Sequence, residues 1–230
     1  MRLHKSGGSI PPVYTIDNTV LPVVVRATDL GVDYDAALSF RPHILIIVRK
    51  AFARSNLILK CFRCRNPVIL VKAFTTYVRP ILEYASQVWS PHYICDIDLI
   101  ESVQRRFTKR LLGCRNANYP SRLSVLNLKS LEYRRTASDL YMCFNILRNH
   151  VDLDPALFFS PSQNTRCRGH SMKLAKSFVN CDLLLYTFHN RVVNIWNWLP
   201  SNVVLAKNTK SFKNLLDGVD LSRFCRWSHL

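Results

Sequence analysis

The sequence predicts a mainly α protein with a small β component (α+β), and two observations carry this prediction. Apolar residues recur at helical spacing over most of the chain after about residue 41, whereas β-branched residues flank a turn pair near its beginning. We therefore expect four regions: a β-hairpin within 1–35, a helical bundle over 36–151, a linker or loop over 152–170 and a smaller helical unit over 171–230.

The first expected element is a short antiparallel ribbon. The β-rich segments Val13–Ile16 and Thr19–Val25 are separated by Asp17-Asn18, a pair that favours a tight hairpin turn. Further along, Gly31 permits a turn or a close approach of the backbone to another group. The period of the apolar residues becomes helical from about residue 41, where the bundle is expected to begin.

The helices of the bundle are located by prolines near their starts and by apolar residues at helical spacing. The expected helices begin at Pro42 and at Asn66-Pro67, restart at Ile81 after Pro80, and then run over Asp96–Gly113 and Ser130–Asn149. The apolar residues on their inner faces are Ile44, Ile47, Val48 and Ala51 in the first, Leu70, Val71, Phe74 and Tyr77 in the second, and Ala137, Leu140, Phe144 and Leu147 in the last.

The segment Asp152–His170 contains two prolines, one glycine and few periodic apolar residues, which indicates a linker or surface loop. Beyond it, Arg191–Leu199 is expected to form a helix that Pro200 closes. A last short helix is expected around Phe212, Leu215 and Leu216.

The chain is strongly basic. Its 32 Lys and Arg residues against 15 Asp and Glu residues give a formal net charge of +17 and a pI near 9.9. Fourteen basic and four acidic residues lie between positions 36 and 115. This balance suits a polyanionic partner better than an acidic small molecule, so we expect nucleic acid as the partner and no small-molecule substrate.

The sequence also predicts a compartment. No stretch resembles a secretory signal, and the longest aliphatic run, Ile44–Val48, is far shorter than the roughly 20 residues of a spanning helix. Eight irregularly spaced cysteines are typical of reduced thiols. We expect an intracellular protein, nuclear or cytoplasmic, with no membrane partner.

The stretch ESVQRRFTKRLLG, residues 101–113, is predicted to be an amphipathic helix with one cationic face. The core-facing stripe, interrupted only by Gln104, consists of Ile97, Ile100, Val103, Phe107 and Leu111. The basic residues on the far side or at its border are Arg105, Arg106, Lys109 and Arg110. An ordinary solvated face is the alternative, but Asp98 is the only acid there, and contact with phosphates is favoured.

Two other groups of residues have a chemical interpretation. The pairs Asp33/Asp35 and Asp96/Asp98 have the oxygens that magnesium needs, but carboxylates at a helix start explain the second pair better. The cysteines and histidine of a possible zinc site are Cys61, Cys64, His92 and Cys95. Thiols that simply pack in the core are the favoured interpretation, so we expect no metal site and no cofactor for this chain.

Trp196 and Trp198 have two interpretations. Exposed indoles would stack on nucleic-acid bases, but Trp196 shares a helical face with apolar neighbours and is expected to anchor the core. Trp198 is less constrained and is expected to be more exposed. His170 lies in a basic loop, for which a contact with nucleic acid and a loop without contacts remain equal alternatives.

Five blocks of sequence closely resemble, in order, the region downstream of the polymerase core in reverse transcriptases of non-LTR (LINE-type) retrotransposons. These blocks are DLGVDYDAALSFRPHI, AFTTYVRPILEYASQVWSPH, DIDLIESVQRRFTKRLLG, LNLKSLEYRRTASDL and RVVNIWNWLP, and together with the hairpin region they span about residues 13 to 216. Each block alone is modestly specific, but five in the same order indicate a shared origin.

The resemblance implies roles for several residues. Leu30, Gly31 and Val32 match the end of the palm, where a hairpin called the primer grip touches the growing strand. The helices that follow resemble the thumb, which holds the RNA–DNA template–primer duplex, and their matching residues are Tyr77, Pro80, Leu82, Glu83, Tyr84, Trp89, Gln104, Arg105, Arg106 and Phe107. The expected architecture is thus a palm-end hairpin, a thumb-like bundle and a C-terminal helical unit.

One departure from the family decides the expected activity. These polymerases require a Tyr/Phe-x-Asp-Asp turn that holds catalytic metal ions, and no Asp-Asp pair occurs in this sequence. We therefore expect a truncated, non-catalytic fragment that binds nucleic acid, with magnesium confined to the missing catalytic palm. A piece that acts only within a longer polymerase, and a basic module that binds protein or an anionic membrane surface, remain alternatives.

Overall fold

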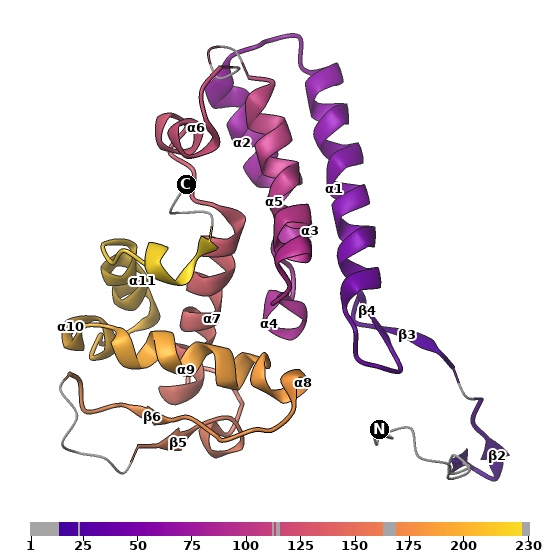
Figure 1. Ribbon diagram of the computed structural model, residues 1–230, viewed down its shortest axis with the longest axis vertical. Coiled ribbons are helices and arrows are strands. Elements are labelled where there is room, and N and C mark those ends of the chain that lie inside the picture. Colours follow the sequence, from indigo (N-terminus) through magenta and orange to yellow (C-terminus); the bar gives the residue numbers. More distant parts are fainter. Residues whose placement is uncertain (1–13, 23, 112, 114–115, 163–168, 227–230) are drawn as a thin grey trace.

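The computed structural model describes residues 14–22, 24–111, 113, 116–162 and 169–226. Its described part is mainly helical, with three short antiparallel strand pairs, which confirms the predicted fold class. Helix α7 (Leu131–Leu147) lies between two groups of helices, one above and to the right in Figure 1 and one below and to the left. Each group has its own apolar core.

Two β-hairpins precede the first helix. Strands β1 (Thr15–Ile16) and β2 (Thr19–Val20) pair across Asp17-Asn18, and both turn residues have positive φ, as a two-residue hairpin turn requires. The predicted ribbon is therefore confirmed as a hairpin, but its second strand ends at Val20 and not at Val25 as expected, and Val13 lies outside the described residues. Strands β3 (Arg26–Asp29) and β4 (Val32–Asp35) form a second hairpin with Leu30-Gly31 at its tip.

The first group contains five helices: α1 (Arg41–Cys61), α2 (Pro67–Tyr77), α3 (Arg79–Glu83), α4 (Ser86–Trp89) and α5 (Ile94–Lys109). Pro42 lies in the first turn of α1, and the Asn66 side chain caps α2 by accepting from the Val68 amide at 2.9 Å. The predicted restart after Pro80 is split, because Ala85 has a φ of 51° and separates α3 from α4.

The limits and one inner face of these helices differ from the predictions. Helix α5 ends at Lys109, and Gly113 lies beyond it, because the Arg110 amide already bonds the Phe107 and Thr108 carbonyls in a tightened last turn. Tyr77 was expected to face inward but is 56% exposed, since α2 stops there. The buried apolar residues of these helices meet in one core, where the Phe74 and Phe107 rings stack with centroids 4.6 Å apart.

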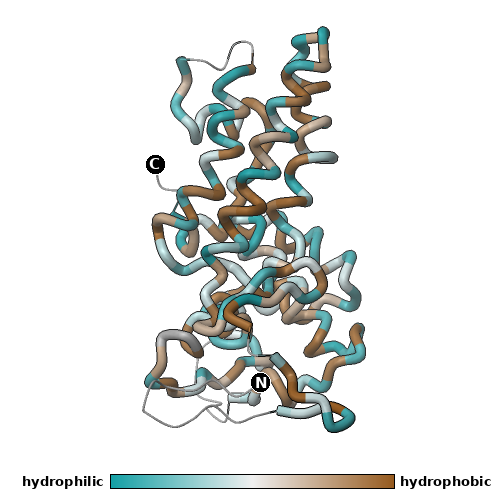
Figure 2. The backbone as a smooth tube through the Cα atoms, turned by 90° about the vertical axis from the view of Figure 1, so that its right-hand side faces the viewer, coloured by the Kyte–Doolittle hydropathy of each residue, from teal (hydrophilic) through white to brown (hydrophobic). Residues whose placement is uncertain are grey.

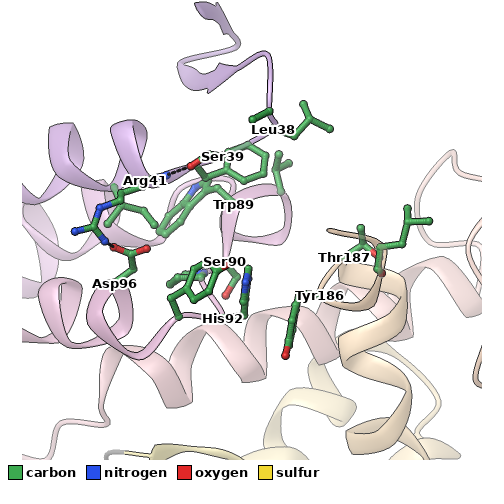
Figure 3. A pocket seen from close by; sticks show the side chains of 16 residues that line it. Leu38, Ser39, Arg41, Trp89, Ser90, His92, Asp96, Tyr186 and Thr187 are labelled. Carbon is green, nitrogen blue, oxygen red and sulfur yellow. Dashed lines mark hydrogen bonds and ion pairs between the residues drawn. The ribbon is translucent and has the colours of Figure 1, made fainter. Parts of the chain in front are cut away.

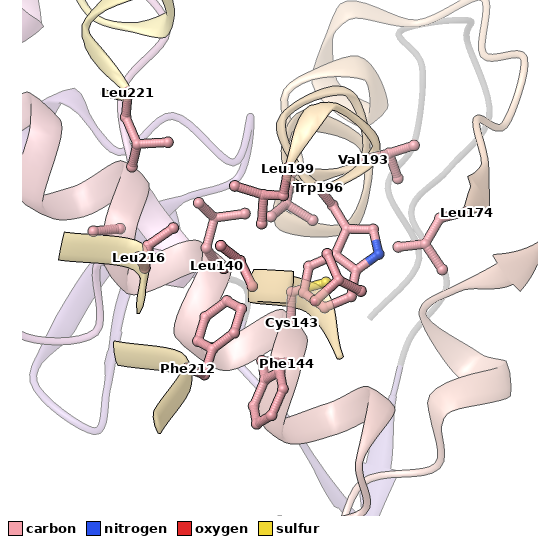
Figure 4. Packing of buried hydrophobic residues seen from close by; sticks show 14 of the residues in the cluster. Leu140, Cys143, Phe144, Leu174, Val193, Trp196, Leu199, Phe212, Leu216 and Leu221 are labelled. Carbon is pink, nitrogen blue, oxygen red and sulfur yellow. The ribbon is translucent and has the colours of Figure 1, made fainter. Parts of the chain in front are cut away.

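The second group surrounds Trp196, which is fully buried (Figure 4). Its elements are η1 (Pro155–Leu157), β5 (Ser160–Pro161), β6 (Leu174–Ala175), α8 (Asp182–Leu185), α9 (Phe188–Trp198), α10 (Ser201–Val204), α11 (Thr209–Asp217) and η2 (Ser222–Phe224). The Phe144 ring from α7 stacks on Phe212 from α11 at 4.3 Å, so α7 forms one wall of this core. Helix α6 (Tyr119–Val125) packs against α5.

Packing joins the expected bundle and the C-terminal unit along α7. Leu131 at the start of α7 belongs to the first core, whereas the buried apolar residues of α7 from Tyr133 to Ile146 belong to the second. The described part of the expected linker takes part in this packing, because Phe159 is 5% exposed and β5 pairs with β6. Apolar and polar stretches alternate along the helices in Figure 2, as one buried face per helix requires.

Candidate nucleic-acid interface

Helices α1 and α5 run side by side in the same direction (Figure 1). Near their starts, Arg41 Nη1 lies 2.5 Å from Asp96 Oδ1, and near their ends Arg110 Nη1 donates to Asn56 Oδ1 at 2.8 Å. The two pairs are separated by 55 and 54 residues along the chain. A nearly constant separation shows that the helices are parallel and in register over the length of α5.

The prediction that one face of α5 packs in the core is confirmed. Val103, Phe107 and Leu111 are at most 2% exposed, and Gln104, the predicted interruption, is fully buried. Gln104 is nevertheless satisfied on its donor side, because its Nε2 donates to Tyr119 Oη and to the Lys129 carbonyl, both at 3.0 Å. The buried polar group therefore connects α5 to the chain that leads into α7.

The four basic residues predicted to contact phosphates lie in different settings. Lys109 is exposed, whereas Arg105 is half-buried. The Arg106 guanidinium lies 5.6 Å from the centre of the Phe52 ring of α1, and Arg110 bonds Asn56 of α1. Arg106 and Arg110 therefore reach from α5 to α1, so the two helices share one face.

Helix α1 is also strongly basic, although the cationic residues predicted from the sequence all lie on α5 or directly after it. No Asp or Glu occurs between residues 36 and 82, a stretch that contains nine Lys and Arg residues. The exposed basic side chains that this stretch places on α1, beyond the ion-paired Arg41, are Arg49, Lys50, Arg54 and Lys60. This acid-free run is the sequence signal that would have located them.

A groove of about 860 Å³ borders this cationic side of α1. Lys50, Arg54 and Leu57 line it from α1, and Tyr84 lines it from the segment after α3. Gly31, at the tip of the second hairpin, lines its end. The groove thus combines two cations, an exposed aromatic ring and a hairpin tip, which are residue types that bind phosphates and bases.

The hairpin tip is held over the groove by two contacts. Tyr84 Oη donates to the Leu30 carbonyl at 3.0 Å, and Val32 is buried against α1 in the first core. Leu30 itself is 83% exposed at the tip. Gly31 has a φ of +81°, a conformation that strains any residue with a Cβ. Gly31 therefore lines the groove, whereas Leu30 is exposed at the tip and Val32 is buried in the first core.

His43 of α1 holds the second hairpin against this helix through its contacts with Asp33. The Asp33 amide donates to His43 Nδ1 at 3.3 Å, and a carboxylate oxygen of Asp33 lies 3.6 Å from the same nitrogen. Burial lowers the pKa of His43, although Asp33 opposes this effect. The hydrogen bond from Thr28 is the main cause that lowers the pKa of Asp33.

The acidic pairs serve local structure. Asp35 accepts from the Ala37 and Ser39 amides at 3.0 and 2.8 Å and so closes the turn before α1. Asp96 is buried beside Arg41. Helix α5 has no side-chain cap, so the expected capping role is wrong for Asp96, which Arg41 holds instead.

The candidate zinc ligands are divided between the two ends of α1. The expectation that their thiols pack in the core is wrong, because Cys61, Cys64 and Cys95 are exposed. Arg41 Nη1, at the start of α1, donates to Cys95 Sγ at 3.4 Å, whereas Cys61 is the last residue of α1. Twenty residue steps of 1.5 Å place these two ends about 30 Å apart. His92 stacks on Tyr186 with centroids 4.0 Å apart. Within the described part of the chain no three His, Cys, Asp or Glu side chains are grouped as metal ligands.

A second, mainly apolar hollow of about 660 Å³ lies where the starts of α1 and α5 approach the α8–α9 junction (Figure 3). Trp89 and Tyr186 line it from opposite sides, and the Arg41–Asp96 ion pair lies at its edge.

The remaining aromatic candidates belong to the second core. Trp196 is fully buried and donates from Nε1 to the Met172 carbonyl at 2.9 Å, which confirms its predicted anchoring role. Trp198 is 37% exposed beneath the Arg223 guanidinium. His170 was expected in a surface loop but is 4% exposed, with Nε2 3.0 Å from the Trp196 carbonyl, because the loop folds back onto α9.

Comparisons with known proteins add one relative. An uncharacterized protein of Caenorhabditis elegans is 30% identical over 125 residues, which cover 53% of this chain and 63% of that protein. The match thus spans less than two thirds of the relative's length. No protein-family model and no solved structure matches the chain. None of the helices in the described regions has the length and apolar character needed to cross a bilayer.

Proposed function

We propose that this chain is the C-terminal part of a non-LTR retrotransposon reverse transcriptase, and that it holds an RNA–DNA template–primer duplex against α1 and α5 without extending it. The observation that carries this proposal is the acid-free cationic face of α1, bordered by the groove that the second hairpin closes. The order of the five sequence blocks supports the family assignment, and the +17 net charge supports a polyanionic partner.

The dimensions of α1 suit a nucleic-acid backbone. Its 21 residues are about 30 Å long, which corresponds to about nine nucleotides of one strand at roughly 3.4 Å each. Several phosphates therefore lie within reach of Arg49, Lys50, Arg54 and Lys60. Contacts of this kind position a duplex without reading its sequence, which is what a polymerase needs behind its active site.

The hairpin tip complements these phosphate contacts. Leu30 offers an exposed apolar side chain, and Gly31 lets the backbone approach the groove closely. Tyr84 presents a ring that is 58% exposed beside them. In this proposal the tip contacts the sugar–base side of the strand whose phosphates lie along α1.

Polymerisation is assigned to residues outside this sequence, because no Asp-Asp pair occurs in it. We expect no primer extension by the purified chain on an RNA template with magnesium and nucleotides supplied. Extension above a no-enzyme control would contradict the assignment.

Salt-titrated binding to an RNA–DNA hybrid tests the interface. Replacing Arg49, Lys50 and Arg54 by Gln should weaken binding for every hybrid sequence and flatten the slope of log K against log salt by about two to three units, since each lost phosphate contact removes about 0.9. The matched control replaces Lys176, Lys207 and Lys210, exposed lysines outside the α1–α5 face, and removes the same charge.

The control variant should retain most of the wild-type slope. Equal slopes for the two variants would show that only total charge matters and would contradict a specific face on α1. Binding to anionic vesicles at least as tight as binding to hybrid would instead favour the alternative of a basic module for membrane surfaces.

A further inference from the structure

A polar hollow of about 360 Å³ lies where α3 and α4 approach α7 and α11. It is lined by a different set of residues from the groove along α1. Its volume is near the lower end of the roughly 300–1,000 Å³ that small-molecule sites occupy. Four of the side chains that line the hollow are cationic and two are acidic. The hollow therefore has the size and the polarity of a site for a small charged ligand.

The charges around the hollow leave an excess of two positive charges. Arg134 and Glu83 neutralise each other, because Arg134 Nη2 donates to Glu83 Oε2 at 3.0 Å. The other charged residues of the lining are three cations and one acid, namely Lys129, Arg135, Lys213 and Asp217. A ligand with two negative charges balances this excess.

Two buried side chains of the lining have polar atoms without a partner in the described part of the chain. Ser86 of α4 is 1% exposed, and its hydroxyl oxygen forms no hydrogen bond there. Arg135 of α7 is 3% exposed, and its Nη1 forms none either, although Glu101 and Asp139 favour its charge. Buried polar atoms are nearly always paired, so these two indicate a bound group that completes the site.

Two lysines extend the cationic lining to the surface. Lys129 directly precedes the cap of α7, Lys213 lies on α11, and both are exposed. Their ammonium nitrogens lie over the rings of Tyr133 and Tyr141, at 4.9 and 5.9 Å from the ring centres. Neither lysine forms an ion pair with another described residue, so both charges are available to a ligand.

We propose that this hollow binds a terminal phosphate group, either free phosphate or a small phosphate monoester. Ser86 and Arg135 donate to the phosphate oxygens, and Lys129 and Lys213 lie at the entrance. A dianionic phosphate matches the excess charge, and its tetrahedral oxygens accept from donors on different sides. A terminal phosphate reaches the buried donors, whereas a diester within a nucleic-acid strand would have to bring chain into the hollow on both sides.

Inorganic phosphate is the first probe, added to the full chain. Isothermal titration calorimetry at constant ionic strength should show one saturable site per chain. Acetate, a planar monoanion, and a dinucleoside phosphate, which contains only a diester, should not compete. Adenosine 5′-monophosphate distinguishes the two sources of the phosphate group: tighter binding than inorganic phosphate assigns the site to a monoester, and equal or weaker binding assigns it to free phosphate.

The Ser86→Ala variant separates a binding role from a structural one. It should weaken phosphate binding about tenfold, because it removes a hydrogen bond to a charged group. In the absence of phosphate it should leave the urea midpoint unchanged or raise it, since the hydroxyl that it removes has no partner in the described structure. A lower midpoint would show that the hydroxyl stabilises the fold and would contradict its assignment as a ligand donor.

The double variant Lys129→Gln/Lys213→Gln should also weaken phosphate binding. Its matched control, Lys207→Gln/Lys210→Gln, removes the same charge at exposed lysines outside the lining of the hollow and should bind phosphate like the wild type. All four positions are exposed, so circular dichroism is expected to show the same helical content in both variants.

Three further results would overturn the proposal: no saturable phosphate binding, an unchanged affinity in Ser86→Ala, or equal losses of affinity in the two lysine variants. Competition by acetate or by the dinucleoside phosphate as strong as that by free phosphate would also overturn it. None of these measurements contains an RNA–DNA hybrid, so this proposal and the proposed nucleic-acid interface fail separately.

Discussion

At the scale of single residues, one buried carboxylate connects the two halves of the fold. Glu101 of α5 is fully buried and accepts from the Leu131 amide at 3.0 Å, from the Glu132 amide at 3.3 Å and from the Tyr119 hydroxyl. It thereby occupies the positive end of α7, where a negative charge is favourable. Burial raises the pKa of the Glu101 carboxyl, and the hydrogen bonds and Arg135 oppose this effect.

Replacing Glu101 by Ala should therefore destabilise the protein strongly. It leaves two amides and the Tyr119 hydroxyl without this acceptor and Arg135 without its nearby carboxylate, so we expect the free energy of unfolding to fall by about 3 kcal/mol. Urea denaturation measures the change. Asp152→Ala, at an exposed site, should change it by less than about 0.5 kcal/mol. Similar values for the two variants would contradict the role assigned to Glu101.

His43 predicts how stability depends on pH. Its pKa in the folded protein is lower than the unfolded value of about 6.5, so the folded state binds a proton less readily. The free energy of unfolding should thus fall as the pH is lowered below about 6.5 and should be unaffected by His43 above that value. A His43→Gln variant should lose part of this decline, while His170 and His189 contribute equally to both proteins. Parallel curves would contradict the expected linkage.

At the scale of helices, α1 is expected to contribute more to binding than α5. Arg105 is half-buried, and Arg106 and Arg110 already contact α1, whereas Arg49 and Arg54 are exposed on α1. Neutralising Arg105, Arg106 and Lys109 together should therefore flatten the salt dependence of hybrid binding by about one to two units, less than the α1 variant does. A larger effect from α5 would reverse this ranking.

The helices also show which features a sequence predicts. Pro42, Asn66-Pro67 and Ser130 mark helix starts correctly, because capping and proline geometry act within a few residues. The burial of His170 and the exposure of Tyr77 were missed, because both depend on contacts between distant segments. In the candidate interface, the α5 cations were predicted from the local sequence and the Leu30–Val32 tip from the family resemblance, but the position of α1 beside both required the tertiary arrangement.

At the scale of the whole molecule, the two cores are joined by ionic contacts as well as by α7. Arg191 of α9 binds both carboxylate oxygens of Asp139 on α7, at 2.7 and 3.0 Å, and donates to the Gln87 carbonyl of α4 at 2.9 Å. Glu83 of α3 binds Arg134 of α7. We expect the cores to unfold together, with coincident transitions for fluorine-labelled Trp89 and Trp196. Two separated midpoints would contradict this coupling.

The most direct test of the proposed function is to locate a bound duplex on the chain. An RNA–DNA hybrid with photoreactive thiouridines in its RNA strand should cross-link to peptides from the second hairpin, residues 26–35, and from α1, residues 41–61. Unlabelled hybrid should compete for these cross-links, and the Arg49, Lys50 and Arg54 variant should reduce them. Cross-links confined to residues 171–226, or cross-links that unlabelled hybrid does not reduce, would contradict a duplex-binding face on α1.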